Sequence, residues 1–173
     1  MKSLQEIART HKPVKQYLRV FLERYGKLFA PIRYDNLTIL EIGVGGYKNP
    51  DKGGGSLRMW AEFFPNSTII GVDLHHKDLD LPDNVHLYQG SQINIEFLNA
   101  LANGRQGFDI VIDDASHITE NTIITFDTLW PITKQFYIVE DLHMKSAQGT
   151  RQYFENIQGA DFDTKNLCVI QRG

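Results

Sequence analysis

Apolar side chains at helical spacing form the first element that the sequence predicts. Between Pro13 and Pro31 they fall on one face of an amphipathic helix, with Pro13 suited to its first turn and Pro31 to its end. The apolar face consists of Val14, Tyr17, Leu18, Phe21, Leu22, Tyr25, Leu28 and Phe29. A helix this regular covers a face or edge of a sheet, so we interpret its aromatic residues as packing residues. A part in shaping a substrate entrance is the alternative.

Short apolar runs after this helix alternate with helix-like segments. The runs predict strands at Leu37–Gly43, Ser67–Leu74, Val85–Gly90, Phe108–Asp114, Gln135–Leu142 and Asn166–Gln171. Helices are expected near Ser56–Phe64, over Asn94–Ala102 and over Ile118–Leu129. Strands without polar alternation are buried on both faces, and helices between them imply parallel crossovers. The pattern predicts an α/β fold with a doubly wound, mostly parallel sheet. We expect one domain over residues 1–173, with a helical segment 1–36 before a core 37–173.

Charge and composition exclude several classes of function. The formal net charge of −3, without a basic stripe, gives no electrostatic footprint for nucleic acid. The one cysteine, Cys168, excludes an internal disulfide and multi-cysteine metal motifs, and its apolar neighbours predict a buried thiol. No apolar run approaches the roughly 18 residues of a membrane span, and the first residues carry no apolar signal core. We expect no membrane partner and, by default, a cytoplasmic location.

Glycine and acidic residues gather where the predicted strands end. The groups are Glu41–Gly46, Asp73, Gly90–Gln92, Asp113 with Asp114, and Glu140 with Asp141. In open α/β sheets, ligands bind beyond these carboxyl ends of the strands. Carboxylates without a ligand role would scatter along exposed helix faces instead, so the placement at one strand end after another favours a ligand site.

The glycine stretch after the first predicted strand discriminates among nucleotide ligands. A dinucleotide turn needs a third glycine, but Lys48 stands there, a polar insert delays the helix, and no Walker A motif occurs. A ligand with a sulfonium, an amino acid end and a ribose fits better than a diphosphate. Glu41 would serve its cationic end and Asp73 its ribose hydroxyls. An NAD-dependent oxidoreductase and a nucleoside-binding module without turnover stay as alternatives.

Six segments between Leu37 and His143 together resemble one enzyme family. They read EIGVGGY, GGGSLRMW, FFPNSTIIGVDL, YQGSQ, FDIVIDDASHI and YIVEDLH. In this order they resemble the class I S-adenosylmethionine-dependent methyltransferases. More narrowly, they resemble the magnesium-dependent sugar (macrolide and rhamnosyl) O-methyltransferases of antibiotic biosynthesis and their cephalosporin-hydroxylase-like relatives. The resemblance implies a Rossmann-like class I methyltransferase fold with S-adenosyl-L-methionine and Mg²⁺ as cofactors. It also implies O-methylation of a sugar or another polyhydroxylated, glycosylated small molecule in natural-product metabolism.

The resemblance implies roles for ten residues around the cofactor. These are Glu41, Gly43 and Gly45 at the methionine part, Asp73 at the ribose hydroxyls, Gly90, Ser91 and Gln92 at the adenine, Asp113 near the methyl-donor end, and Tyr47 and Ser56 as residues that close over the cofactor. For Ser56, a helix N-cap is the alternative.

Three carboxylates that follow the fourth and fifth predicted strands are expected to converge. Asp114, Glu140 and Asp141 would supply the oxygen ligands that Mg²⁺ prefers, and would repel one another without a cation. The family's metal triad has the same arrangement. The alternative is that one or two of them cap helices or bind substrate directly. The resemblance makes His117 the general base; from sequence alone a capping or solvated histidine is equally consistent. His143, which follows the acidic pair and ranks second, would instead orient a ligand or touch the substrate.

The resemblance also bears on the C-terminal region. Only residues 144–166 link the fifth predicted strand to the last one. Compared with the family, this predicts a shortened C-terminal strand region, in which the usual antiparallel hairpin is cut down or partly missing. A homo-oligomer is a further expectation.

Overall fold

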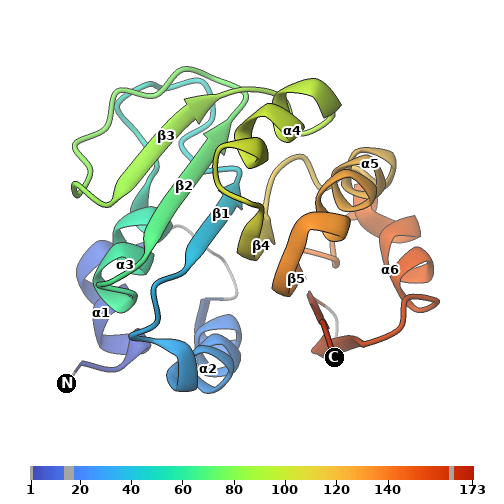
Figure 1. The fold of residues 1–173 in the computed structure, drawn as a ribbon, viewed down its shortest axis with the longest axis horizontal. Helices are drawn as coiled ribbons and strands as arrows, with labels where there is room; N and C mark the ends of the chain where they lie inside the picture. Colours follow the sequence, from blue (N-terminus) through green and yellow to red (C-terminus); the bar gives the residue numbers. More distant parts are fainter. Residues whose placement is uncertain (1, 14–17, 164–165) are drawn as a thin grey trace.

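A central sheet organises the structure, a computed structural model that describes residues 2–13, 18–163 and 166–173. Within these ranges, seven strands pair in the order β3-β2-β1-β4-β5-β7-β6, and the first five of them are labelled in Figure 1. They are β1 Thr38–Ile42, β2 Thr68–Asp73, β3 Val85–Gln89, β4 Phe108–Asp113, β5 Thr133–Val139, β6 Ala160–Asp163 and β7 Leu167–Gln171. Neighbours from β3 to β5 are parallel, and β7 runs antiparallel to β5 and β6. The predicted doubly wound, mostly parallel sheet is confirmed.

Helices cover both faces of this sheet (Figure 1). One face carries α1 (Leu4–His11), α2 (Leu18–Phe29) and α3 (Gly55–Phe63), and the other carries α4 (Ile95–Asn103), α5 (Thr119–Leu129) and α6 (Gln148–Phe154). Short 3₁₀ turns are η1 (Ala30–Ile32), η2 (Trp130–Ile132) and η3 (Lys145–Ala147). Successive strand residues point to opposite faces, so Ile39 packs in one core cluster and Leu40 in the other. This two-sided burial explains why the strands read as unbroken apolar runs.

The predicted amphipathic helix is present as α2. Its residues Phe21, Tyr25 and Phe29 are buried in the core, and Pro31 lies in the 3₁₀ turn that follows it. Val14 and Tyr17, predicted on the same apolar face, lie outside the described residues. No helix within the described ranges combines the length and the apolar character that a membrane crossing requires.

Helix α1 has no counterpart among the predicted elements. It begins with a capping box, in which the Glu6 backbone N–H donates to Ser3 Oγ (3.3 Å) and the Ser3 N–H donates to Glu6 Oε2 (2.7 Å). Its apolar face consists of Leu4, Ile7 and Ala8, all of them buried. Eight residues are too few for a periodicity argument, so the Ser-x-x-Glu capping box is the signal that could have revealed this helix.

Both strands of the C-terminal hairpin are present. Strands β6 and β7 pair along their lengths, with Ala160 opposite Ile170, so the expectation that the hairpin is partly missing is wrong. Strand β6 is an edge strand with an exposed Asp161, and this polar alternation hides it from a search for unbroken apolar runs. Cys168 in β7 is buried, which confirms its predicted role, and burial raises the pKa of its thiol to about 12.

Candidate active site

The carboxyl ends of β2, β1, β4 and β5 lie in one row and carry most of the predicted site residues. Backbone hydrogen bonds continue the sheet just past the strand ends. Gly43 N–H donates to Val72 O (2.8 Å), Asp114 N–H to Ile42 O (2.9 Å), and Glu140 N–H to Asp113 O (3.0 Å). This pairing brings segments from four regions of the sequence into register, as parallel topology predicts.

The glycine turn after β1 contains glycines with two different tasks. Gly43 has a left-handed φ of +90°, and a Cβ there would collide with the carbonyl oxygen of Asp114 and lie 2.8 Å from Ala115 Cα. Gly43 therefore allows the ends of β1 and β4 to approach each other. Gly45, with a φ of +77°, is different because a Cβ there would meet only Gly53 Cα, at 3.9 Å. The open space beside Gly45 suits close approach of a ligand to the backbone.

The polar insert, residues 46–53, is anchored to the following loop by a buried lysine. Lys77 is 7% exposed, and its Nζ donates to the carbonyl oxygens of Tyr47, Asn49 (3.1 Å) and Lys52 (3.4 Å). Three converging carbonyl groups compensate the desolvated ammonium group. Tyr47 itself adopts a left-handed φ of +48° and is 89% exposed. The insert is thus held in a defined conformation that presents the Tyr47 side chain to solvent.

Replacing Lys77 by methionine is expected to lower the free energy of unfolding by about 1–3 kcal/mol, because three carbonyl groups lose a buried donor. Denaturant unfolding of the variant and the wild type measures this difference. Lys48→Met is the matched control, since it removes an exposed lysine side chain from the same insert. Equal stability of the Lys77 and Lys48 variants would contradict an anchoring role.

Asp73 is held in a fixed orientation at the end of β2. Its Oδ2 accepts the Val44 N–H (3.2 Å) from the glycine turn, and its Oδ1 accepts the His75 N–H (2.9 Å). Its backbone carbonyl also accepts the Gly90 N–H (2.9 Å). Asp73 therefore connects the turns after β1, β2 and β3, which are the three turns predicted to surround the nucleoside.

The predicted adenine-binding segment after β3 is fixed by internal contacts. A Cβ at Gly90 would collide with the Phe97 ring, so this glycine lets α4 pack against β3. The buried Gln92 side chain donates to Thr125 Oγ1 (3.1 Å) and Asp113 Oδ1 (3.4 Å) and accepts the Ser116 N–H (3.0 Å). Gln92 thus braces the turn after β4, and its contact with adenine stays a prediction.

The segment's remaining residue, Ser91, accepts the Ile93 N–H on its hydroxyl (3.4 Å). Ser56 is buried at the second position of α3, whose N-cap is Gly54, so the alternative reading of Ser56 as an N-cap is wrong. The predicted contacts of Ser91 and Ser56 with the cofactor stay predictions.

Asp113 is a buried carboxyl group at the end of β4. Its pKa is raised to about 7, mainly by burial; the hydrogen bond from the Ala115 backbone N–H opposes this shift, and the nearby charge of Asp114 adds to it. Tyr137 Oη also donates to Asp113 Oδ2 at 3.4 Å. Asp113 is therefore a buried carboxyl group whose proton affinity is high, and its place near the methyl-donor end stays a prediction.

Two buried glutamates at the strand ends accept hydrogen bonds from aromatic side chains. Glu41 Oε2 accepts from Trp60 Nε1 (2.9 Å), and Glu140 Oε1 accepts from Tyr25 Oη (2.6 Å). Burial raises the pKa of Tyr25 well above its usual value, and the charges of Glu140, Asp114 and Glu41 add to the effect. Tyr25 is therefore a hydrogen-bond donor at every physiological pH.

Asp114, His117 and Asp141 are the one group in the described part of the chain with the spacing of a cation site. Ligand atoms of all three lie within 4.8 Å of one another. His117 Nε2 is 3.9 Å from Asp114 Oδ1 and 3.8 Å from Asp141 Oδ2, while His143 Nδ1 is 3.9 Å from Asp141 Oδ1. The structure thus brings together two of the three predicted metal ligands and the predicted base. The third predicted ligand, Glu140, is not part of this group, and its Oε1 accepts the hydrogen bond from Tyr25.

His117 and Asp141 also share an uncommon backbone conformation. Their φ angles are +53° and +56°, in the left-handed region that costs a non-glycine residue about 1–3 kcal/mol. Such residues persist where the surrounding structure holds them, and they concentrate at functional sites. Two of them within one three-residue group support a functional interpretation of that group.

Three residues contact the site but are absent from the predicted set: Tyr25, Trp60 and Lys77. Tyr25 lies on the apolar face of α2 and was predicted to pack, and Trp60 lies inside α3. The signal that could have revealed them is chemical, because a buried tyrosine or tryptophan needs a partner for its polar atom. For Lys77, a lysine in a loop, we find no signal in the sequence.

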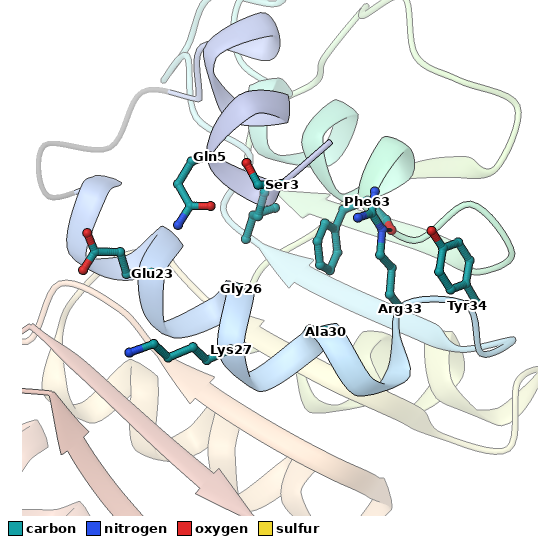
Figure 2. A pocket seen from close by; sticks show the side chains of 10 residues that line it. Ser3, Gln5, Glu23, Gly26, Lys27, Ala30, Arg33, Tyr34 and Phe63 are labelled. Carbon is teal, nitrogen blue, oxygen red and sulfur yellow. Dashed lines mark hydrogen bonds between the residues drawn. The ribbon is translucent and has the colours of Figure 1, made fainter. Parts of the chain in front are cut away.

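A cavity of about 480 Å³ lies away from this row of strand ends, between α1, α2 and the end of α3 (Figure 2). Its wall includes Leu4, Gly26, Arg33 and Phe63, and none of the predicted site residues lines it. Arg33 packs over the Phe63 ring (4.4 Å to the ring centre) and donates to the backbone oxygens of Phe63 and Lys2. The Arg33 guanidinium group at this cavity is thus bound to the protein itself, and Glu23 and Lys27 are further charged residues of the wall.

Several known proteins are similar to this chain, although no protein-family model matches it. One is the 8-demethyl-8-(2-methoxy-alpha-L-rhamnosyl)-tetracenomycin-C 3'-O-methyltransferase of Streptomyces olivaceus, which is 44% identical to this chain over 124 residues. This alignment covers 70% of this chain and 32% of the Streptomyces protein. Another is the mycinamicin VI 2''-O-methyltransferase of Micromonospora griseorubida, which is 40% identical over 137 residues. This alignment covers 78% of this chain and 34% of the Micromonospora protein.

A solved structure shares the fold over almost the whole chain. It is the MycE methyltransferase from the mycinamycin biosynthetic pathway in complex with Mg, SAH and mycinamycin VI. The TM-score is 0.87 at 30% identity, over 99% of this chain and 54% of that one. The chain therefore spans about half of the solved relative and about a third of the two curated relatives.

Proposed function

This chain belongs to the class I S-adenosylmethionine-dependent methyltransferases, and from that premise we propose that it methylates a sugar hydroxyl of a glycosylated small molecule, with Mg²⁺ as cofactor. The observation that carries the proposal is the group of Asp114, His117 and Asp141, whose ligand atoms lie within 4.8 Å of one another. Simple binding of a nucleoside requires neither this acidic group nor its histidine.

The methyl donor would lie along the row from β1 to β3. The space beside Gly45 suits its amino acid end, and the buried carboxyl group of Glu41 in β1 would serve the cationic part of that end. Asp73, oriented by two backbone N–H groups, would accept from the ribose hydroxyls. Gly90 and Ser91 would border the adenine, and the other predicted cofactor residues follow as proposals: Gly43, Tyr47, Ser56, Gln92 and Asp113.

The acidic ends of β4 and β5 fit a divalent cation. We assign Asp114, Glu140 and Asp141 as the residues that would hold Mg²⁺, because it prefers carboxylate oxygens and these groups would repel one another without it. When bound, the ion would supply positive charge that makes an acceptor hydroxyl more acidic.

His117 would act as the general base. Its Nε2, beside both aspartates, would take the proton of the acceptor hydroxyl. The oxygen then forms a bond to the methyl carbon of the donor, the carbon–sulfur bond breaks with its electron pair on sulfur, and S-adenosylhomocysteine leaves. The protein contributes mainly the alignment of the two substrates and the compensation of charge.

The two alternative functions lack support from the site. A dinucleotide would need a phosphate-binding helix start at the glycine turn, but α3 begins only at Gly55, behind the anchored insert. The relatives are named as O-methyltransferases, not as oxidoreductases or binding modules. Cytoplasmic location, a homo-oligomer, the lack of a nucleic-acid partner and the single-domain division at residue 37 stay predictions.

Ligand-dependent thermal unfolding tests the proposal. S-adenosylhomocysteine at about 100 times its Kd should stabilise the chain by about 2.7 kcal/mol, and each kcal/mol raises Tm by about 2–4 °C in a protein of this size. Mg²⁺ should add a further increase that EDTA removes. Asp114→Ala should lose the Mg²⁺ response and keep the cofactor response. Stronger stabilisation by NAD⁺ than by S-adenosylhomocysteine would refute the proposal.

The acceptor class is tested by turnover. Mycinamicin VI and rhamnosylated tetracenomycin C are suitable first acceptors, because relatives of this chain are named for them. Release of S-adenosylhomocysteine with a glycosylated acceptor, and none with the matching aglycone, is the expected result.

A further inference from the structure

The buried phenol of Tyr25 contacts a carboxylate that the proposed metal site uses. Tyr25 lies on α2, 115 residues from Glu140 in the sequence, and its Oη donates a 2.6 Å hydrogen bond to Glu140 Oε1. Both residues are 1% exposed, so water has almost no access to this bond. A short hydrogen bond to a buried carboxylate is among the stronger kinds in proteins.

Packing fixes the phenol independently of Glu140. The Tyr25 ring stacks on Phe29, with 5.4 Å between ring centres and 7° between planes, and meets Trp60 edge-on at 5.3 Å and 85°. Phe21 closes a further side at 6.4 Å. Because these rings determine where the Tyr25 hydroxyl lies, the hydroxyl determines where Glu140 Oε1 lies.

On the basis of the proposed function, we propose that Tyr25 is a positioning residue that holds Glu140 for one-oxygen binding of Mg²⁺ and thereby favours Mg²⁺ over Ca²⁺. The bond to Tyr25 occupies Oε1, which favours coordination through a single oxygen of Glu140. Mg²⁺ requires a near-octahedral set of single oxygens, whereas Ca²⁺ takes six to eight oxygens and readily accepts both oxygens of one carboxylate. Partners behind a metal ligand tune a site in this way.

A purely structural role for Tyr25 makes a different prediction. If the bond served only to satisfy a buried phenol and a buried carboxylate, its loss would lower stability and weaken all cations alike. A change in the ratio of the Kd values for Mg²⁺ and Ca²⁺ therefore separates a positioning role from a structural one.

Calorimetric titration of the full chain with MgCl₂ and with CaCl₂, in the presence of S-adenosylhomocysteine, tests the proposal. In Tyr25→Phe the Kd for Mg²⁺ should rise about tenfold or more, while the Kd for Ca²⁺ changes less. Tyr153→Phe is the matched control, because Tyr153 Oη likewise donates a short hydrogen bond (2.7 Å) to a carboxylate, Asp127 in α5, and neither residue belongs to the proposed metal site. The control should keep both affinities. An unchanged Kd for Mg²⁺ in Tyr25→Phe, or equal losses for both ions, would overturn the proposal.

Two further measurements keep the outcomes distinct. A wild-type chain that binds no Mg²⁺ would overturn the metal site and the role of Tyr25 with it. If the wild type binds Mg²⁺ and Tyr25→Phe binds it with the same Kd, only the role of Tyr25 is overturned. If Tyr25→Phe does not fold, hydrogen exchange of the unmodified chain decides: Mg²⁺ should slow amide exchange in α2 around Tyr25. Binding of Mg²⁺ without any change in α2 would overturn the proposal.

Discussion

Replacing His117 by asparagine is expected to lower kcat about 100- to 10,000-fold, the usual contribution of a general base, and to leave binding of S-adenosylhomocysteine and Mg²⁺ intact. The imidazole nitrogen lies within 4 Å of both Asp114 and Asp141, where a proton taken from substrate is stabilised by two carboxylates. An asparagine amide cannot take that proton. Asparagine also tolerates the left-handed φ of +53° at this position, so the backbone should be preserved.

Turnover with the acceptor that supports wild-type activity measures this effect, with His143→Asn as the control. His143 approaches Asp141 at 3.9 Å, and we assign it no proton transfer, so its loss should lower kcat much less. Equal losses in the two variants would remove the distinction between these histidines. Loss of Mg²⁺ binding in His117→Asn would instead make His117 a metal ligand.

The strands and their ends could be predicted because one physical pattern specifies both. Runs such as Phe108–Asp114 are apolar on two faces and end in carboxylates, and the structure has β4 there. Parallel topology then brings those ends into one row, which is why Asp114 and Asp141 could be expected as neighbours before any coordinates. The sequence was sufficient wherever long-range position follows from topology alone.

Contacts that depend on side-chain direction could not be predicted in this way. Glu140 and Asp141 are adjacent, yet one is turned to Tyr25 in the core and the other to His117. The left-handed backbone of Asp141 accompanies this divergence. Lys77 is a second case, because its partners are carbonyl groups, which every residue possesses and no sequence pattern reveals. Helical periodicity likewise predicted that Tyr25 packs in the core. This is correct for its ring, but the periodicity could not predict that its hydroxyl donates to Glu140.

Alanine at Gly43 is expected to lower the free energy of unfolding by about 2–6 kcal/mol. A left-handed φ costs a residue with a side chain about 1–3 kcal/mol, and overpacking costs about 1–3 kcal/mol more. Both apply here, because φ is +90° and the new Cβ would collide with the backbone of Asp114. Denaturant unfolding measures the loss. Since Asp114 belongs to the proposed metal site, displacement of its backbone should also weaken the Mg²⁺ response.

Gly45→Ala is the control that separates a glycine needed by the fold from one needed by the ligand. Its φ of +77° carries a similar conformational cost, but the added Cβ meets only Gly53 Cα at 3.9 Å, so the loss of stability should be about 1–3 kcal/mol. The methyl group would instead enter the open space assigned to the amino acid end of the methyl donor, so affinity for S-adenosylhomocysteine should fall. If Gly45→Ala binds S-adenosylhomocysteine as tightly as the wild type, the donor does not approach the backbone at Gly45, because an added methyl group would otherwise occupy the same space.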